Sequence, residues 1–598
     1  MKGLFGICVV CLCVPLLTAV VLAEDSSITQ ENSGDPPLQL KEVLVLGQDL
    51  RFPGLPSTSS RLGLTTTHTP ASIHIIDKTE LKNEGYKNVA EAVETVPGVT
   101  WGNSPAQPFS FSMRGFTENQ ITILRDGIWL GPASMAGRPQ NGFNLDRIEL
   151  LKGPASVLHG QGAIAGTLNM VTKRPPTNGQ EDTWEALLSY GRYDTIKLGG
   201  GTGGSVSETL SYRMDLSHTS TDGYVEAANS RSLNGTGSLL WKPLDGLEVT
   251  LGFDYMEDSL PNYWGTPLVS GAVGTKSLKG VVETTDGRTI DKRMRFLNYN
   301  VSNEKANSHQ YFTHLDVKWR LNSSVSLRNT FYYFAADREW RNAETYTFNA
   351  ATSLIDRDRF FVSHDQHTVG NRINATLQSP VATLPNTVLL GMDFSYVDFT
   401  RRSRFFGNVD SVDPFNPSPG LFADPGQSFL NPTKITTVAV YVEDSLEVTS
   451  DLRLVAALRQ DFIRLNRDSF NLDGSVNGAN AFERTFRPLS WRLGIVYDLT
   501  PSIVTYGQWT SGADPVGSNI FLVNGNQDFD LTNADQWEIG IKSQFLDGRL
   551  NVLLAGYYIE RENILVAIGG GGLVDNVGRQ RSSGFEFEGL LRATSQWS

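Results

Sequence analysis

From Trp184 to its end, the chain alternates apolar and polar residues at every second position, and this pattern constrains the fold more than any other feature. In the stretch 452–462 the two kinds of residue take opposite faces, with Leu452, Leu454, Ala456, Leu458 and Phe462 against Arg453, Arg459 and Asp461. A strand with this period places one face against apolar surroundings and the other against water. The pattern predicts a long series of half-buried β-strands.

The lengths of the connections distinguish a membrane barrel from a soluble sandwich. Short, tight connections occur at 242–246, 321–323, 449–451, 499–502 and 547–549. They alternate with long polar connections near 256–310, 335–362, 400–432, 464–486 and 511–533. Short turns at one end and long loops at the other are typical of outer-membrane barrels, and these turns predict about sixteen strands, the last near 582–591. Aromatic residues near strand ends, such as Trp241, Trp509 and Tyr558, suit the girdles of such a barrel.

Residues 1–23 have the features of a secretory signal peptide, with an apolar stretch after Lys2 and a small-residue exit. All three cysteines, Cys8, Cys11 and Cys13, lie in this segment. Its removal leaves no thiol, which excludes disulfides, cysteine-bound zinc and thiol catalysis. A lipoprotein cysteine at Cys11 or Cys13 is the alternative interpretation. Beyond this segment, no stretch approaches the ~20 continuous apolar residues of a membrane helix.

Composition excludes several classes of function. The 51 Lys and Arg residues against 64 Asp and Glu residues give a net charge of −13, without a basic stripe, so nucleic-acid binding is not expected. The sequence contains no G-x-S-x-G or other nucleophile motif, and we expect no enzyme activity. His364 and His367 are spaced as H-x-x-H, but two histidines without further ligands do not predict a metal site.

Two segments precede the alternating region. Residues 24–60 are polar and predicted to be flexible, yet they contain the strand-forming run Glu42–Gly47, which fits either strand addition to a partner or an edge strand of the next domain. Residues 61–175 contain many Gly and Pro residues between short predicted elements. These elements include a helix at 88–93 and a strand at 121–124 that leads into an Asp-Gly turn. We interpret 61–175 as a compact α+β domain and 183–598 as the barrel.

Residues 61–175 resemble the plug of TonB-dependent outer-membrane receptors, and in particular the ferric-siderophore group. The resemblance rests on NVAEAVETVPG at 88–98, FSMRGF at 111–116, ILRDG at 123–127 and the long block 146–174. The run Glu42, Val43, Leu44, Val45, Leu46 and Gly47 is similar to the family's TonB box, which favours strand addition. The resemblance implies an all-β transmembrane barrel of the 22-stranded type with the N-terminal α+β plug in its lumen.

The end of the chain departs from the family. The sequence stops at Ser598, soon after Gly584–Glu588, whereas family members continue for about six more strands. The C-terminal strands of the barrel are therefore expected to be missing from this sequence.

The resemblance implies an active importer of ferric siderophores in the Gram-negative outer membrane, a monomer surrounded by lipid and lipopolysaccharide. Energy would come from TonB, with ExbB and ExbD, at the inner membrane. Iron would travel as the ferric-siderophore complex, and no resident cofactor or protein-bound metal is implied. Two alternatives remain open, a family member with another cargo such as haem or cobalamin, and a passive plugged porin or phage-binding barrel.

The resemblance also suggests a reversible lock between plug and barrel. Arg114, in Ser-Met-Arg-Gly, matches the family's plug arginine, and two further plug cations, Arg147 and Lys152, lie near it in the motif order. Their expected partners are the inward-facing carboxylates Glu538, Glu586 and Glu588, through charge-assisted hydrogen bonds. The alternative is a set of separate solvated charges, and the choice between Glu586 and Glu588 stays open.

The ligand site is expected where three plug loops reach the outer face of the plug. The candidate residues offer aromatic surface and hydrogen bonds suited to a bulky chelate: Trp101, Asn103, Gln107, Gln120, Trp129 and Arg138, with Tyr263 and Trp264 from barrel loops. For each of them, ordinary packing is the alternative.

Overall fold

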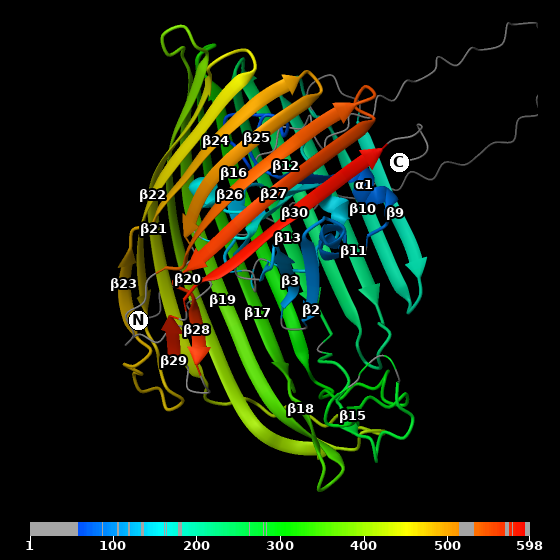
Figure 1. Cartoon of the computed structure of the whole chain (residues 1–598). Helices are drawn as coiled ribbons and strands as arrows, with labels where there is room; N and C mark the ends of the chain where they lie inside the picture. The colour runs from blue at the N-terminus through cyan, green and yellow to red at the C-terminus, as the bar shows by residue number, and fades with distance from the viewer. Residues whose placement is uncertain are drawn as a thin grey trace, which may run out of the picture. The chain divides into compact units, whose positions relative to one another are not determined.

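The computed structural model describes residues 58–591, except 87, 105–106, 118–119, 133–134, 136, 161, 163, 177–181, 262, 279, 281, 283, 514–530, 569–572 and 577. The predicted signal peptide at 1–23 and the run Glu42–Gly47 lie outside the described residues. The described part of the chain is coloured from blue to red in Figure 1.

The N-terminal domain is a plug built on two small sheets. The larger has the order β1-β7-β8-β5-β6, with β1 at Ile73–Asp77, β7 at Leu145–Lys152, β8 at Gly166–Thr172, β5 at Ile121–Arg125 and β6 at Ile128–Trp129. The smaller joins β2 (Val99–Ser104), β3 (Gln107–Met113) and β4 (Phe116–Thr117). The predicted strand and its turn are confirmed, because Asp126 and Gly127 both have positive φ between β5 and β6, as a type I′ turn requires.

The plug helices are short and begin at well-formed caps. The Asp77 carboxylate caps α1 (Lys78–Asn83) by accepting the backbone N–H groups of Thr79 and Glu80. The Asn88 side chain caps α2 (Val89–Glu94), so the predicted helix is present and shifted by one residue. The described residues of the plug also contain the 3-10 helix η2 (Gly142–Asn144) and α4 (Ser156–His159). No helix in the described residues is long and apolar enough to cross a membrane.

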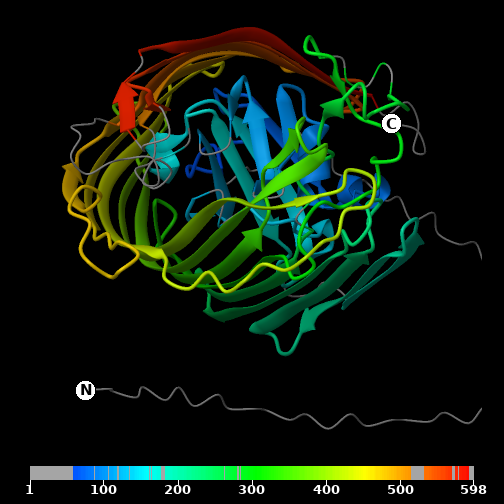
Figure 2. The same ribbon diagram turned by 90° about the horizontal axis from the view of Figure 1, so that it is seen from below.

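Most of the strands after the plug form one antiparallel sheet with the strand order of a barrel. Among the described residues it contains sixteen strands of nine or more residues: β9 (Thr183–Gly191), β10 (Thr195–Ser205), β11 (Leu210–Thr221), β12 (Ser230–Leu244), β13 (Leu247–Ser259), β16 (Lys305–Arg320), β17 (Val325–Asn342), β19 (Leu354–Gln378), β20 (Asn386–Val412), β21 (Phe429–Glu447), β22 (Leu452–Arg467), β24 (Leu489–Thr500), β25 (Ile503–Ala513), β26 (Asn533–Phe545), β27 (Leu550–Glu562) and β30 (Gln580–Leu591). Figure 2 shows the blue plug inside the curve of these strands.

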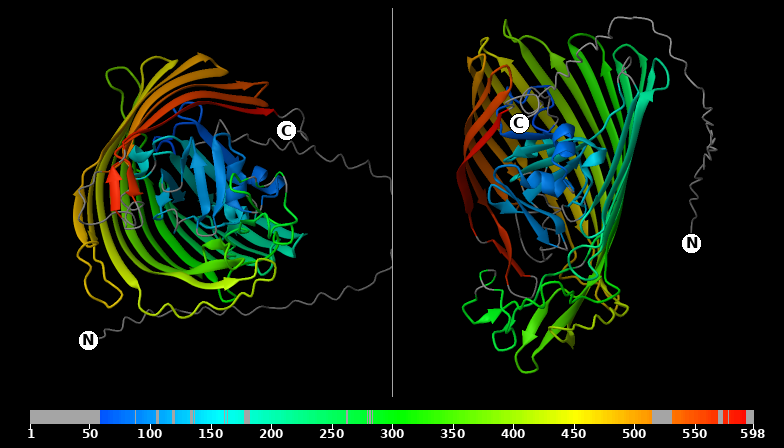
Figure 3. Two further views of the ribbon diagram at one scale, coloured as in Figure 1. Left: turned by 60° about the horizontal axis from the view of Figure 1, so that its bottom comes forward. Right: turned by 90° about the vertical axis from the view of Figure 1, so that its right-hand side faces the viewer.

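Several short strands lie at one end of the sheet. They are β18 (Tyr346–Asn349) on β19, β23 (Phe482–Phe486) on β22, and the loop pairs β14 (Val269–Ser270) with β15 (Arg288–Thr289) and β28 (Leu565–Ile568) with β29 (Leu573–Asn576). Figure 3 shows β15 and β18 together at the end that carries the long connections. The other end carries the tight turns, such as 245–246 between β12 and β13. We call these the long-loop end and the short-turn end.

The long connections are shorter than the sequence predicts, because the strands continue through them. The sequence pattern predicts a loop at 335–362, but β17 extends to Asn342 and β19 begins at Leu354. In the predicted loop 400–432, β20 likewise continues to Val412 and β21 begins at Phe429, which leaves a connection at 413–428. Antiparallel pairing of β19 and β20 persists to Ile355 and Val412, so the hydrogen-bond ladder carries these strands beyond the alternating wall.

The outer face of the sheet is apolar, as the alternation predicts. Leu454, Leu458 and Phe462 are exposed on β22, and so are Trp537, Ile539 and Ile541 on β26. An aromatic row crosses four neighbouring strands on this face, from Trp491 through Trp509 and Trp537 to Tyr558, with neighbouring ring centroids 5.7–6.2 Å apart. Such a row suits the boundary between hydrocarbon and water.

The inner face is less uniformly polar than the sequence predicts. An apolar patch on β16–β22 joins the plug's own hydrophobic core: Phe312, Tyr332, Phe334, Val397, Phe399, Ile435, Ile463 and Leu465. On these strands the burial of apolar side chains against the plug replaces water in the lumen. The polar contacts that hold the plug lie mainly beside this patch.

Candidate functional site

The strongest polar contact between plug and barrel is made by Arg114. It sits with φ +52 beside Gly115 in the two-residue turn between β3 and β4, which presents its side chain at the tip of the hairpin. Its Nε and Nη2 donate to the two carboxylate oxygens of Glu586 at 3.0 and 2.9 Å, and Nη1 donates to Glu538 at 2.7 Å. A fork of this kind is a strong charge-assisted contact.

The surroundings of Arg114 are closely fitted and dry. The side chains of Arg114 and Glu538 are fully buried, and that of Glu586 is 4% exposed. The guanidinium also lies 4.3 Å from the ring centroid of Tyr557. Gly98 has φ +77, and a Cβ there would lie 2.6 Å from Glu586 Oε1, so glycine lets the plug backbone approach this carboxylate. Burial opposes the charge, but the two carboxylates raise the pKa of Arg114, which stays protonated.

A second contact set extends the first along β30. Lys152 Nζ donates to Glu588 at 2.6 Å and lies 3.3 Å from Glu586. His74 Nδ1 lies 2.9 Å from the other oxygen of Glu588. Both carboxylates therefore contact the plug, Glu586 mainly through Arg114 and Glu588 through Lys152 and His74. We call Arg114, Lys152, Glu538, Glu586 and Glu588 the lock.

The prediction that Arg147 belongs to this lock is wrong. Its Nε donates to Glu149 at 2.8 Å and its Nη1 to Asp146 at 2.9 Å, and both partners are plug residues. These carboxylates raise the pKa of Arg147, although burial opposes its charge. Arg147 is on β7 in the larger plug sheet, whereas Arg114 is in the smaller one, so its proximity in the sequence motif does not bring it to the barrel.

Residues 58–72, which we call the strap, connect the lock to the N-terminal segment. On the barrel side, Lys542 Nζ donates to the carbonyl oxygens of Thr66 and Thr69, each at 2.6 Å. Glu443 accepts the Arg61 backbone N–H at 3.0 Å. These wall residues lie near the short-turn end of their strands, so the strap runs along that end of the barrel.

The strap ends directly on a lock residue. Ser72 donates its backbone N–H and its hydroxyl to Glu538 Oε1, at 2.9 and 2.8 Å. Tyr506 donates to the same oxygen at 2.6 Å, while Oε2 accepts Arg114. One carboxylate thus holds the strap with one oxygen and the plug arginine with the other. A displacement of the strap at Ser72 would act on the lock without an intermediate.

The first residue of the described chain is also held. The Thr58 backbone N–H donates to Glu149 at 3.0 Å, and His159 Nε2 lies 2.7 Å from the Thr58 carbonyl oxygen. Burial, together with the nearby Arg61 cation, lowers the pKa of His159 well below its usual value. The ring is neutral, and Nε2 donates its proton to Thr58.

The sequence analysis did not predict the strap contacts, although the strand periodicity indicated which barrel residues face inward. Glu538 and Lys542 share the inward face of β26, and both prove to be plug-facing. Which plug atoms they contact depends on the tertiary structure. The same holds for Asp254 and Asp258 on the inward face of β13, which pair with the plug arginines Arg125 and Arg138.

The candidate ligand residues do not form one site in the described structure. Arg138 is 2% exposed and donates through Nε to Asp258 at 2.8 Å, so it joins plug to wall instead of facing an open pocket. Trp101 and Trp129 are partly buried against the plug core. Gln120 is half-buried, and its backbone carbonyl oxygen accepts a hydrogen bond from the Ala165 N–H. Asn103 and Gln107 lie at the facing ends of β2 and β3, and their side chains are outside the described parts.

The two barrel-loop candidates are packed within their loops. Trp264 donates through Nε1 to Asn342 at 2.8 Å and contacts Trp340 edge-on at 5.9 Å between centroids. The Tyr263 hydroxyl lies 2.9 Å from that of Thr266. Packing, the alternative interpretation, accounts for both residues in this conformation.

We expect Lys542→Met to loosen the strap. The substitution keeps a long apolar stem but removes both donors to Thr66 and Thr69, and a lost charged hydrogen bond costs roughly 1.5–3 kcal/mol. Limited proteolysis should therefore cut the strap roughly ten- to hundredfold faster, because each ~1.4 kcal/mol taken from the free energy of local opening raises the open population about tenfold. Lys434→Met, at an exposed position of β21, is the matched control. Equal cleavage rates in both variants would contradict the assigned anchor.

Comparison with known proteins places these features in a family. Residues 240–598 match the model described as TonB dependent receptor-like, beta-barrel, and residues 65–167 match the TonB-dependent Receptor Plug Domain. The metal-pseudopaline receptor CntO of Pseudomonas aeruginosa (strain UCBPP-PA14) is 23% identical over 463 residues, which cover 76% of this chain. The chain spans 62% of the length of that relative.

Other relatives align over more of the chain. The catecholate siderophore receptor Fiu of Escherichia coli O157:H7 is 24% identical, covering 90% of this chain and 75% of the relative. The crystal structure of Fiu from E. coli K12 in its closed form superposes with a TM-score of 0.78 at 19% identity, covering 91% of this chain and 81% of that one. The siderophore receptor PiuA of Acinetobacter baumannii gives 0.77 at 19% identity, covering 90% and 80%. At these identities the structural similarity shows that the fold is shared.

Proposed function

The chain belongs to the family of TonB-dependent outer-membrane receptors, and on that premise we propose that it imports ferric siderophores with energy supplied through TonB. The family is one of transport receptors, so no catalytic residue is assigned. The observation that carries the proposal is the shared carboxylate Glu538, which ties the strap to the plug arginine. A plug held this way is secure at rest and can be released by tension on one segment.

The mechanism follows from the order of the contacts along the chain. TonB would bind the run Glu42–Gly47 by strand addition, which gives a grip made of backbone hydrogen bonds. Tension then passes into the strap, breaks the contacts of Thr58 and Arg61 first and those of Lys542 next, and reaches Ser72 and Glu538 last. Each hydrogen bond is modest on its own, so the strap opens one contact at a time instead of all at once.

The cargo assignment rests on the relatives. Fiu and PiuA are named as siderophore receptors, and a ferric siderophore is the cargo we propose here. One specific observation favours a second candidate, because CntO is named as a receptor for metal-pseudopaline. A metal chelate of that kind is the alternative within the same mechanism, whereas haem and cobalamin have no such support among these relatives.

A tryptophan-fluorescence titration of the full-length receptor tests the cargo. Trp101 and Trp129 lie in the plug, and a chelate bound above them should quench part of the emission of the 11 tryptophans. We expect saturable quenching by one class of ferric siderophore, catecholate or hydroxamate, and none by its iron-free form. Trp129→Phe should reduce the response, whereas Trp537→Phe, on the outer face, should leave it unchanged.

The same titration includes a metal-pseudopaline chelate, haem and cobalamin. Saturation by the metal-pseudopaline chelate alone would shift the assignment to the second candidate. A response only to haem or cobalamin would refute both and leave the barrel and plug as described.

A further inference from the structure

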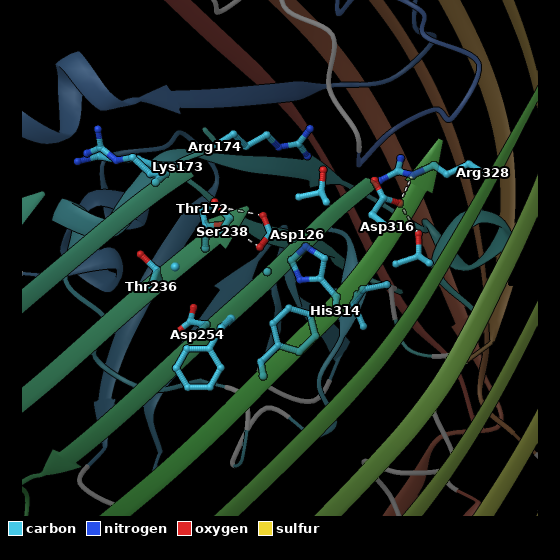
Figure 4. Close-up of a pocket in the computed structure, with 18 residues that line it drawn as sticks. Asp126, Thr172, Lys173, Arg174, Thr236, Ser238, Asp254, His314, Asp316 and Arg328 are labelled. Atoms are coloured by element: carbon cyan, nitrogen blue, oxygen red, sulfur yellow. Dashed lines mark hydrogen bonds and ion pairs between the residues drawn. The ribbon is translucent and has the colours of Figure 1, made fainter. Parts of the chain in front are cut away.

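A cavity of about 40 Å³ lies between the plug and the wall formed by β11–β17. Figure 4 shows its polar lining, with Asp126 and Thr172 of the plug facing Ser238 and His314 of the wall. On the plug side, Thr172 donates its N–H and hydroxyl to Asp126 at 3.0 and 2.8 Å, so the lining is held in place. The cavity is a defined feature of the plug–wall boundary.

Two polar atoms at this cavity indicate that it is hydrated. Ser238 Oγ and His314 Nδ1 are both buried, and neither has a hydrogen-bond partner among the described residues. Leaving such atoms unsatisfied is costly, and water is the simplest partner in a polar cavity. Since one water needs roughly 10–15 Å³ by the same kind of measure, the space suits a few waters. The plug–wall boundary is therefore hydrated at this cavity.

A much larger space lies on the other side of Arg328, at the short-turn end. This vestibule of about 900 Å³ is lined by the turn after β12, the adjoining ends of β16 and β17, and Arg61 of the strap. Arg328 lines both the cavity and the vestibule, so this side chain lies between the two spaces. The vestibule falls within the usual size range of small-molecule sites, about 300–1,000 Å³. Removal of the strap would take Arg61 away from its rim.

Ion pairs border the cavity at both ends. Towards the vestibule, Arg328 Nε donates to Asp316 at 2.7 Å. Towards the long-loop end, the lining residue of β13 farthest along the strand is Asp254, which pairs with Arg125 of the plug. The first pair is part of the wall and the second joins wall to plug. Movement of the plug would therefore break the pair of Arg125 with Asp254. The pair of Arg328 with Asp316 would stay, and only the flexible Arg328 side chain would then lie between the cavity and the vestibule.

We propose that this cavity is a preformed part of the route by which the cargo passes the plug, along the inner wall of β12–β17 and out past Arg328 into the vestibule. The proposal rests on the proposed transport function and adds the side on which passage occurs. The lining carries both carboxylates and cations, a surface that a polar metal chelate can pass without losing all hydration. The lock on β26 and β30 would release the plug without lining the route.

Single cysteines test the route, because all three native cysteines lie in residues 1–23. Ser238→Cys and Thr250→Cys place a thiol at the cavity, and Ser445→Cys is the matched control, a buried inward position of β21 outside the cavity lining whose hydroxyl accepts a hydrogen bond from Arg453. A small methanethiosulfonate reagent is applied to the resting full-length receptor from the short-turn side. We expect labelling at the cavity to be roughly tenfold faster than at position 445, because a hydrated path needs less local opening.

A second readout links the route to transport. A bulky thiol reagent attached at position 238 should leave chelate binding intact and stop uptake, and a reductant that removes it should restore uptake. Equal labelling at positions 238, 250 and 445 would overturn the route, and so would normal uptake by the labelled Ser238→Cys receptor. Fast cavity labelling in a receptor that imports no chelate would refute the proposed function instead, and would leave the hydrated path in place.

Discussion

Replacement of Arg114 by alanine is expected to loosen the plug in the barrel, at a cost of about 3–5 kcal/mol in the free energy of unfolding of the plug. The arginine neutralises Glu538 and Glu586, whose side chains are 0% and 4% exposed. Without it, two buried carboxylates lose their main cation. Lys152 still reaches Glu586 at 3.3 Å, but Glu538 keeps only neutral donors. Calorimetry of the purified receptor, followed by limited proteolysis of the plug, measures the effect.

Two control variants separate the charge from the packing. Arg147→Lys changes a plug arginine whose partners, Asp146 and Glu149, belong to the plug itself, and it keeps a cation beside the buried Glu149, so it should leave plug seating nearly unchanged. Adding Glu538→Gln and Glu586→Gln to Arg114→Ala should restore part of the lost stability, because neutral amides do not need a counter-charge. An Arg114→Ala receptor that unfolds like Arg147→Lys would show that the lock does not hold the plug.

Deletion of Glu42–Gly47 is expected to abolish energised uptake while leaving cargo binding at the wild-type level. The deleted run lies outside residues 58–591, so none of the described plug, strap or barrel contacts is removed. What is lost is the run that a partner would bind in order to pull on the strap. Uptake and binding of a labelled ferric siderophore, measured on the same cells, report the two properties separately.

A deletion of residues 26–31 is the matched control, because it shortens the same polar segment by six residues without touching the strand-forming run. It should transport normally. If deletion of Glu42–Gly47 leaves uptake unchanged, the receptor is a passive plugged porin and the mechanical role of the strap is refuted. Loss of binding together with uptake would instead place this run in the folding of the receptor.

The two experiments address opposite ends of one mechanical path. Between them lie the strap contacts on Lys542 and the double contact of Ser72 with Glu538. If tension travels this way, Ser72→Ala should weaken the coupling while Arg114 still holds the plug, since only one of the two Ser72 donors is its hydroxyl. The lock and the strap are thus separable by mutation.

The sequence by itself determined the architecture, because the signals involved are local. Alternation at period two defined which residues of β22 and β26 face outward, and the spacing of turns located the strands through 580–591. Motifs identified the plug and pointed to Arg114. Strand periodicity even placed Glu538 and Lys542 on the inward face. These properties depend only on neighbouring residues along one strand or turn.

Only the tertiary structure decided which inward side chains meet which plug atoms. Periodicity gives the face of a residue but not its height in the barrel, which is set by register between strands and by the docking of the plug. For this reason Arg147 proved to be an internal plug contact, Arg138 joined Asp258, and the pairing of Glu586 with Arg114 and Glu588 with Lys152 could not be read from the sequence. The strap and the wet cavity arise in the same way, since each brings together residues far apart in the sequence, and such contacts exist only after the barrel strands have folded around the plug.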